Sequence, residues 1–172
     1  MQCWDKAAMH QVLSATLDTP LTVVLPSFQE QPDLLPIELT SLGERFSIKP
    51  AHGGGGEGVV VEATAMEQVL VARREHPNDR YLLQAHVAPA QIGSRPAWYR
   101  IIYCTGKAFA CWWDTGTHVY TPVTAEEEAG YHLDPLGGMA SQIARICGLD
   151  LFSTEIAQTA EGRFIVVDYV ND

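Results

Sequence analysis

A run of glycines carries the clearest chemical signal in this sequence. Four consecutive glycines are followed by Glu57 and one more glycine, which gives the set Gly53, Gly54, Gly55, Gly56 and Gly58. Glycine has no Cβ atom, so its backbone N–H groups can approach an anion closely, and a row of them can surround phosphate oxygens. A loose surface turn is the alternative, but these glycines join two apolar, strand-like segments directly. No Lys-Ser or Lys-Thr pair follows, which excludes a Walker A loop, and we interpret the segment as a phosphate-binding hairpin.

A lysine stands immediately before this loop, in the segment Phe-Ser-Ile-Lys-Pro. Strand alternation places Phe46 and Ile48 on one face and Ser47 and Lys49 on the other. Lys49 would therefore leave the end of the strand beneath the glycine hairpin, as a point charge for phosphate. Taken alone, the segment is equally compatible with a solvated lysine at a strand end.

An arginine lies inside a later apolar strand, at Arg100. A buried charge is costly unless it is paired. One interpretation is a structural salt bridge with one of the 21 acidic residues. The other, which we favour, is a functional role, in which the planar fork of donors binds an anionic group.

The composition limits the classes of function. With 47% hydrophobic and 19% charged residues, the 172-residue chain is typical of globular proteins. A net charge of −10 argues against binding along a nucleic-acid backbone. No apolar run approaches the roughly 20 residues of a membrane helix, and no signal peptide is recognisable. The four cysteines are scattered, which favours reduced thiols and a cytoplasmic location. An acidic protein can still bind a phosphate group if its few cations converge on one site and a metal assists.

Periodicity and breaker residues predict a mixed set of elements. Helices are expected over 5–15, between Pro36 and Gly43, over 65–74, and from the Asp134-Pro135 cap to Cys147. Strands are expected over 22–25, 46–49, 59–61, 81–87, 97–103, 107–113, 152–157 and 163–170. Residues 114–134 stay unassigned. This order predicts an α+β protein built from antiparallel hairpins rather than a doubly wound parallel sheet.

Taken together, these motifs resemble the ATP-grasp family, of the RimK and D-alanine–D-alanine ligase type. The Lys49-Pro50 strand before the glycine loop is similar to that family's pattern, and the Asp5-Lys6 helix followed by Thr19-Pro20 is similar to its opening. The resemblance implies two small α+β lobes with antiparallel sheets that clasp ATP. It assigns Lys6 and Lys49 to the phosphates. We expect three segments: residues 1–45, the glycine-loop lobe 46–87, and the lobe 88–172 with the phosphate and metal residues.

The segment 82–87 resembles the family's hinge strand, in which backbone atoms pair with the adenine edge. This implies nucleotide contacts at Gln84, Ala85, His86 and Val87. Ala85 and His86 replace the more usual acidic or basic residue and an aromatic, so adenine selection would depend on the backbone. Taken alone, His86 is expected to be a partly buried polar residue. Arg100 with Gly106-Lys107 resembles the family's Arg-x5-Gly-Lys hairpin.

The last hairpin resembles the family's metal-binding strands. Carboxylate and amide oxygens are ligands that Mg²⁺ prefers. The resemblance implies that Glu155 and Asp168 face each other across the two strands and bind magnesium, with Asn171 completing the site. The family spaces its last acid and asparagine by two residues, whereas Asp168 and Asn171 are three apart. A bulge or a rotation of the chain would be needed, and Asp172 is a substitute ligand.

The resemblance implies an ATP–Mg²⁺ module of a carboxylate–amine or carboxylate–thiol ligase that acts through an acyl phosphate, with Arg100 on that group. A kinase of a small hydroxylated molecule and a non-catalytic nucleotide-binding module are the alternatives. We expect a small substrate that carries a carboxylate, and no nucleic-acid or membrane partner. We also expect this chain to be a fragment of a longer protein, and the fragment by itself to be inactive. A homodimer is compatible with the sequence. The aromatics Trp112, Trp113, His118 and Tyr120 are more typical of a core than of a pocket.

Overall fold

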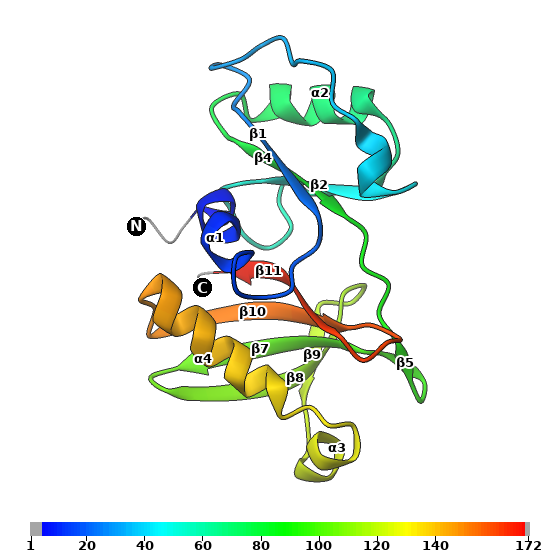
Figure 1. Ribbon diagram of the computed structural model, residues 1–172, viewed down its shortest axis with the longest axis vertical. Helices are drawn as coiled ribbons and strands as arrows, with labels where there is room; N and C mark the ends of the chain where they lie inside the picture. Colours follow the sequence, from blue (N-terminus) through cyan, green and yellow to red (C-terminus); the bar gives the residue numbers. More distant parts are fainter. Residues whose placement is uncertain (1–4, 171–172) are drawn as a thin grey trace. The chain divides into compact units, whose positions relative to one another are not determined.

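The computed structural model describes residues 5–170 and shows helices combined with antiparallel sheets (Figure 1). The helices are α1 (Lys6–Leu13), the 3-10 helix η1 (Leu39–Leu42), α2 (Met66–Glu75), α3 (Ala125–Gly130) and α4 (Pro135–Cys147). The strands are β1 (Thr22–Leu25), β2 (Phe46–Pro50), β3 (Val60–Ala63), β4 (Tyr81–Ala85), β5 (Gln91–Ile92), β6 (Arg95–Pro96), β7 (Trp98–Cys104), β8 (Lys107–Asp114), β9 (Val119–Pro122), β10 (Leu151–Gln158) and β11 (Phe164–Val170). None of the helices in this described range is long and apolar enough to cross a membrane.

The chain divides into two compact units, which we describe separately. The first unit contains residues 5–8 and 20–86, and the second contains residues 9–19 and 87–170. Helix α1 therefore begins in the first unit and ends in the second. The division after His86 falls next to the predicted boundary between 46–87 and 88–172. A separate segment over 1–45 stays a prediction, and its strand β1 pairs with β4.

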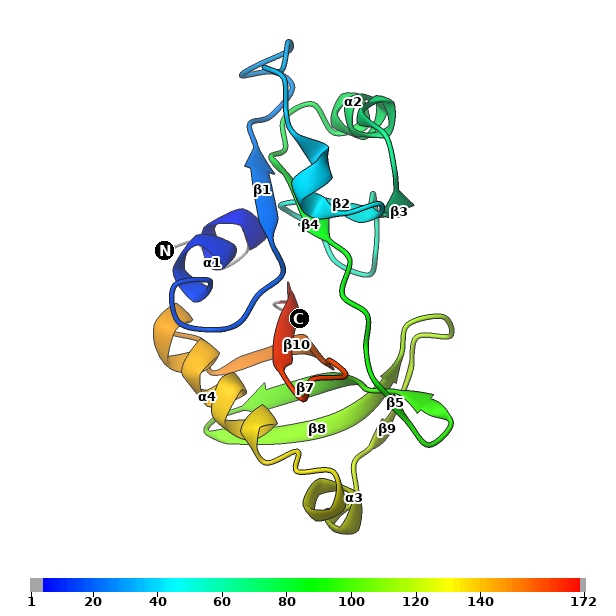
Figure 2. The ribbon, with the colours of Figure 1, turned by 45° about the vertical axis from the view of Figure 1, so that its right-hand side comes forward.

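The first unit is built on a four-stranded antiparallel sheet in the order β1-β4-β2-β3, with α2 alongside it (Figures 1 and 2). One face carries the core, in which Phe46 and Ile48 pack with Leu83 and with Val69 of α2. The other face packs Leu82 against Ala7 and Ala51. The predicted alternation along β2 is confirmed, because residues 46, 48 and 50 are buried and residues 47 and 49 are only half-buried.

The second unit contains a five-stranded antiparallel sheet in the order β11-β10-β7-β8-β9 (Figure 2). Helix α4 packs across β7, β8 and β10. Tyr99 and Ile101 of β7 and Ile156 of β10 are buried, and strand alternation therefore sends Arg100 to the face opposite α4. A short hairpin of β5 and β6 was not predicted. Strand β9 and helix α3 fill the segment that the sequence left unassigned.

Two predicted helix starts differ from the structure. Pro36 does not begin a helix; the 3-10 helix starts at Leu39, because Leu39 and Leu42, three residues apart, place their side chains on the core. Helix α4 does start at Pro135 and end at Cys147, and the following Gly148, with φ +68°, caps it. Asp134, however, has helical backbone angles and makes no side-chain cap, so the proline alone marks this helix start.

A fully buried arginine, Arg73 of α2, holds the loop that follows β1. Its guanidinium donates hydrogen bonds to the carbonyl oxygens of Pro26 (3.0 Å), Ser27 (3.0 Å) and Gln31 (2.7 Å). The Phe28 ring lies 5.9 Å from its Cζ atom. One side chain thus bonds three carbonyl groups of this loop, and the Ser27 carbonyl also accepts from the backbone N–H of Gln31 at 3.1 Å.

Replacement of this arginine tests its role in stability. We expect Arg73→Met to lower the free energy of unfolding by about 2–4 kcal/mol, because the substitution leaves buried carbonyl groups without donors. Arg74→Met is the matched control, since Arg74 is exposed and lies at the same 5.9 Å from the Phe28 ring. It should change stability by less than about 0.5 kcal/mol. Urea unfolding measures both, and equal effects would contradict the proposed loop anchor.

Candidate functional site

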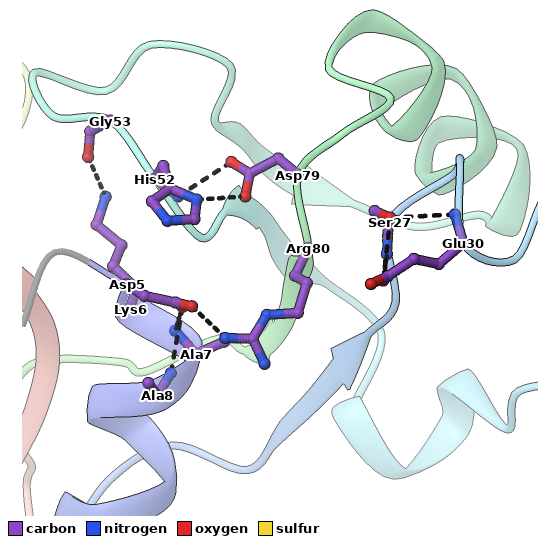
Figure 3. Close-up of polar contacts among 10 residues, drawn as sticks. All are labelled: Asp5, Lys6, Ala7, Ala8, Ser27, Glu30, His52, Gly53, Asp79 and Arg80. Carbon is purple, nitrogen blue, oxygen red and sulfur yellow. Dashed lines mark hydrogen bonds and ion pairs between the residues drawn. The ribbon is translucent and has the colours of Figure 1, made fainter. Parts of the chain in front are cut away.

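The start of α1 is tied to the root of the glycine loop in the first unit (Figure 3). The ammonium group of Lys6, a residue that is only 7% exposed, donates a hydrogen bond to the carbonyl oxygen of Gly53 at 3.0 Å. The backbone N–H of Lys6 also donates to Ala51 at 2.9 Å. Among the described residues this lysine is therefore a buried cation bonded to a neutral carbonyl, which leaves its charge available to an anion at the loop.

Two side-chain pairs, Asp5 with Arg80 and Asp79 with His52, hold the same corner of the first unit. The carboxylate of Asp5 accepts hydrogen bonds from the N–H groups of Ala7 (2.9 Å) and Ala8 (3.2 Å) and pairs with Arg80. Burial would raise the pKa of Asp5, but Arg80 and the two N–H groups outweigh it and the pKa is lowered. Asp5 thus caps the helix that presents Lys6.

The second pair, between Asp79 and His52, was not predicted. Asp79 accepts a hydrogen bond from the backbone N–H of His52 at 3.0 Å, and its other oxygen lies 2.7 Å from Nδ1 of the same residue. Asp79 thereby fixes the backbone one residue before Gly53. Residues 52 and 79 are far apart in sequence, and only the Pro-Asn-Asp turn hinted at a structured segment. A cavity of about 510 Å³ borders this corner, lined by residues that include His52, Gly53 and Glu57.

The glycine loop forms the predicted hairpin between β2 and β3. The glycines at 53, 55, 56 and 58 all have positive φ, from +64° to +96°. Side chains other than glycine rarely adopt that conformation. At Gly58 a Cβ atom would also lie 3.1 Å from the His76 ring and 3.3 Å from Pro50. This backbone is of the type that forms anion-binding concavities.

The other predicted nucleotide residues of the first unit lie on β2 and β4. Lys49 pairs with Leu82 across these strands, and Ser47 pairs with Gln84, which is 2% exposed. Lys49 thus lies on the face opposite the main core, the face that also packs Ala7, the neighbour of Lys6. The structure therefore places the two predicted phosphate lysines on the same side of this sheet.

The hinge segment differs in part from the expectation. The N–H of Ala85 donates to the carbonyl of Leu21 at 2.8 Å, so adenine would have to use other backbone atoms of this segment. His86 is exposed, not partly buried, because β4 ends at Ala85 and the chain leaves the sheet there. Val87 belongs to the second unit, where it packs, like Trp98, against a buried cluster that includes Ala157 and Ile165.

In the second unit Arg100 is held by polar and aromatic partners. Its guanidinium donates to Oγ of Ser153 at 2.7 Å and lies 3.6 Å from the carboxylate of Glu155, with both charged side chains less than 20% exposed. The Trp113 ring lies 5.1 Å from its Cζ atom. The predicted phosphate fork and the predicted metal ligand Glu155 are thus neighbours, and Ser153 is a partner that sequence reasoning missed.

The predicted metal residues Glu155 and Asp168 are directly opposite each other on β10 and β11. The register shifts between Glu155 and Ile156, so an irregularity lies immediately before Asp168 on β11. Asn171 and Asp172 lie outside the described residues. Within residues 5–170 no group of three or more His, Cys, Asp or Glu side chains gathers to hold a metal.

A buried histidine supports the strand that carries Asp168. Nδ1 of His10 in α1 lies 3.4 Å from the hydroxyl of Tyr169, the residue after Asp168. Burial lowers the pKa of His10 and raises the pKa of Tyr169, so the neutral form of each is favoured. The contact connects α1 to β11 within the second unit.

The lowered pKa of His10 predicts a loss of stability in acid. Unfolding returns the imidazole to its ordinary pKa of 6.5, so the unfolded state binds the proton first as pH falls. Its contribution is complete above pH 6.5 and declines below it, by at most about 1.4 kcal/mol per pH unit. We expect the unfolding free energy, measured between pH 8 and pH 5, to fall less steeply with decreasing pH in His10→Gln than in the wild-type protein. The exposed His132→Gln should keep the wild-type slope, and equal slopes in all three proteins would contradict this assignment.

Comparison with known proteins shows the fold. No protein-family model matches the sequence, and no curated protein matches it. Among solved structures, the D-alanine–D-alanine ligase from Coxiella burnetii matches with a TM-score of 0.73 at 14% identity, over 98% of this chain and 47% of that one. A RimK domain ATP-grasp protein from Sphaerobacter thermophilus gives 0.64 at 14%, over 99% and 59%. The ATP-grasp ligase PsnB, complexed with a minimal precursor, Mg and ADP, gives 0.58 at 12%, over 95% and 47%.

These matches cover nearly all of the described chain and are therefore evidence about both units. The chain has the ATP-grasp fold, an α+β architecture with antiparallel sheets. The expected fold class is confirmed. The chain spans 47% to 59% of the length of these three structures.

Proposed function

We propose that this chain is the ATP- and Mg²⁺-binding module of an ATP-dependent carboxylate–amine or carboxylate–thiol ligase. The observation that carries the proposal is the buried Lys6, whose ammonium group lies on the root of a positive-φ glycine loop within an ATP-grasp fold. A cation that is bonded to a carbonyl group and sits beside backbone able to surround an anion is suited to phosphate. The ligase neighbours favour the same chemistry.

The first unit would bind the phosphate chain. Lys6 and Lys49 are its proposed point charges, and the glycine loop supplies N–H donors without Cβ interference. The pairs Asp5–Arg80 and Asp79–His52 act as positioning contacts, because they fix the residues adjacent to Lys6 and Gly53. The hinge residues Gln84, Ala85, His86 and Val87 are proposed for adenine, through their backbone atoms.

The donor set of the second unit fits magnesium. Glu155 and Asp168 offer carboxylate oxygens from directly opposed positions, and Asn171 follows on the same chain end. One oxygen of Glu155 accepts a hydrogen bond from Nε1 of Trp98 at 3.2 Å, which orients the carboxylate. When bound, Mg²⁺ would screen the negative charge of the phosphate oxygens. The magnesium and ADP found in PsnB favour this assignment.

Arg100 is the proposed catalytic residue. Its guanidinium can form two parallel hydrogen bonds to the oxygens of a transferred phosphoryl group, and Ser153 and Glu155 hold it in place. Stabilising this group as it moves from ATP to the substrate carboxylate lowers the barrier without a general base. The complete reaction is proposed for the longer protein, since this chain spans about half of its structural neighbours.

Calorimetric titration of ATP, with and without Mg²⁺, tests the module directly. We expect Mg²⁺-dependent binding by the wild-type chain. Lys49→Ala should weaken it by about 10- to 100-fold, the cost of a charge-assisted contact, and Glu155→Gln should remove the Mg²⁺ dependence. Lys107→Ala is the control, because that lysine is exposed at a hairpin turn.

Each outcome has a separate meaning. Unchanged binding in Lys49→Ala would contradict the phosphate assignment, and a retained Mg²⁺ effect in Glu155→Gln would contradict the metal site. Absence of ATP binding by the wild-type chain at millimolar ATP would contradict the proposed function of the chain itself.

A further inference from the structure

The face of the second-unit sheet opposite α4 has two chemically different halves, and Arg100 lies at the border between them. We call it the arginine face. On the β10–β11 side, the register places Ser153, Glu155 and Asp168 beside Arg100. On the β8–β9 side, strand alternation places an aromatic set consisting of Phe109, Trp113 and Tyr120. Arg100 contacts both sides, at 2.7 Å from Ser153 Oγ and 5.1 Å from the Trp113 ring.

These aromatic residues are not core residues. Phe109 is 53% exposed and Tyr120 is 51% exposed, although both are large and lie on one sheet face. Trp112, the neighbour of Trp113 in sequence, points to the other face. There it is 5% exposed and packs on Tyr99 with ring centroids 4.9 Å apart. Trp113 is half-buried beside the Arg100 guanidinium, and the exposed Tyr120 ring lies 6.2 Å from it. An aromatic pair that stays open to water beside a cation is typical of a binding surface.

The hairpin that presents the aromatic set is ordered by its own turn. The carboxylate of Asp114 accepts hydrogen bonds from the N–H groups of Gly116 (2.9 Å) and Thr117 (3.2 Å). The N–H of His118 donates to the Asp114 carbonyl at 2.9 Å. The His118 ring stacks on Trp113 at 5.7 Å and 30°, and the Tyr120 ring lies 6.2 Å from Trp113. The rings therefore form a preorganised platform, which reduces the entropy cost of binding.

We propose that this platform is the specificity subsite for the acyl substrate, and that the substrate is an aromatic carboxylic acid. The proposal rests on the proposed function, in which Arg100 holds the carboxylate once it becomes an acyl phosphate. When the substrate carboxylate is bound at Arg100, the rest of the substrate must extend either over the β10–β11 half or over the β8–β9 half of the arginine face. The acidic half repels an anionic substrate and is assigned to the metal, so the organic part lies over Trp113 and Tyr120.

The spacing limits the length of the substrate. The Trp113 ring is 5.1 Å from the guanidinium carbon, and Tyr120 is the next ring outward. A substrate ring joined to its carboxylate by one to three bonds therefore reaches the platform while the carboxylate stays on Arg100. Aromatic amino acids and peptides that end in an aromatic residue share this chemistry.

Binding of matched acids tests the proposal. Calorimetry would compare 3-phenylpropionate with hexanoate, an acid of similar length without a ring, in the presence of Mg²⁺ and a non-hydrolysable ATP analogue, and again without nucleotide. We expect the aromatic acid to bind about tenfold more tightly, the gain of one or two ring contacts. Tyr120→Ala should remove most of this preference, and Tyr120→Phe should keep it. Val119→Ala, at an exposed neighbour of Tyr120, is the control.

The outcomes separate this proposal from the proposed function. ATP–Mg²⁺ binding with equal affinity for the two acids would overturn the aromatic subsite alone. A ring preference that Tyr120→Ala removes, in a chain that binds no ATP, would support the subsite and overturn the proposed function. A preference unchanged in Tyr120→Ala would overturn the subsite. Phenylalanine and glycyl-phenylalanine, titrated in parallel, distinguish a free amino acid from a peptide terminus as the source of the ring.

Discussion

The cross-strand register of β7, β10 and β11 is the constraint on which the second unit depends. It places Arg100, Glu155 and Asp168 in one row across three strands. Two carboxylates directly opposite each other repel, and a sheet tolerates such a pair only when positive charge compensates it. Arg100 supplies that charge from one side, at 3.6 Å from Glu155. In the proposed function, Arg100 and a metal on the carboxylates would compensate the charge of the same phosphate group.

The first unit keeps one lysine, Lys6, buried in an acidic protein without pairing it to a described carboxylate. Two of its four arginines are paired with acids, as Arg80–Asp5 and Arg45–Glu62. Lys6 differs, since its described hydrogen bond goes to a carbonyl oxygen. Its neighbour Asp5 is occupied by Arg80 and by two backbone N–H groups. The geometry of α1 thus separates an acid and a lysine that are adjacent in sequence, and only the lysine is directed to the glycine loop.

Local chemistry explains which features could be predicted from the sequence. Alternation along β2 and the glycine hairpin follow from a period of two and from turn residues, which act over short distances. The pairing of Glu155 with Asp168 was implied by the family resemblance, and the register of β10 and β11 confirms it. The contacts that could not be predicted join distant segments. Asp79 contacts His52, which lies in a distant segment of the first unit, and Arg73 bonds to carbonyl groups rather than to a carboxylate. Glu155 is one of 21 acids that could have paired with Arg100. Periodicity carries no information about such choices.

Trp112 and Trp113 show how far the period of two decides function. The two tryptophans are adjacent in sequence, and composition alone assigns both to a core. Because successive side chains in a strand point to opposite faces, only one of them can pack beneath α4. Trp112 is buried against Tyr99, and Trp113 is therefore turned to the face that carries Arg100. Trp113 is thus not a core residue that failed to pack. Its place on that face follows from the same strand geometry that aligns Arg100 with Glu155.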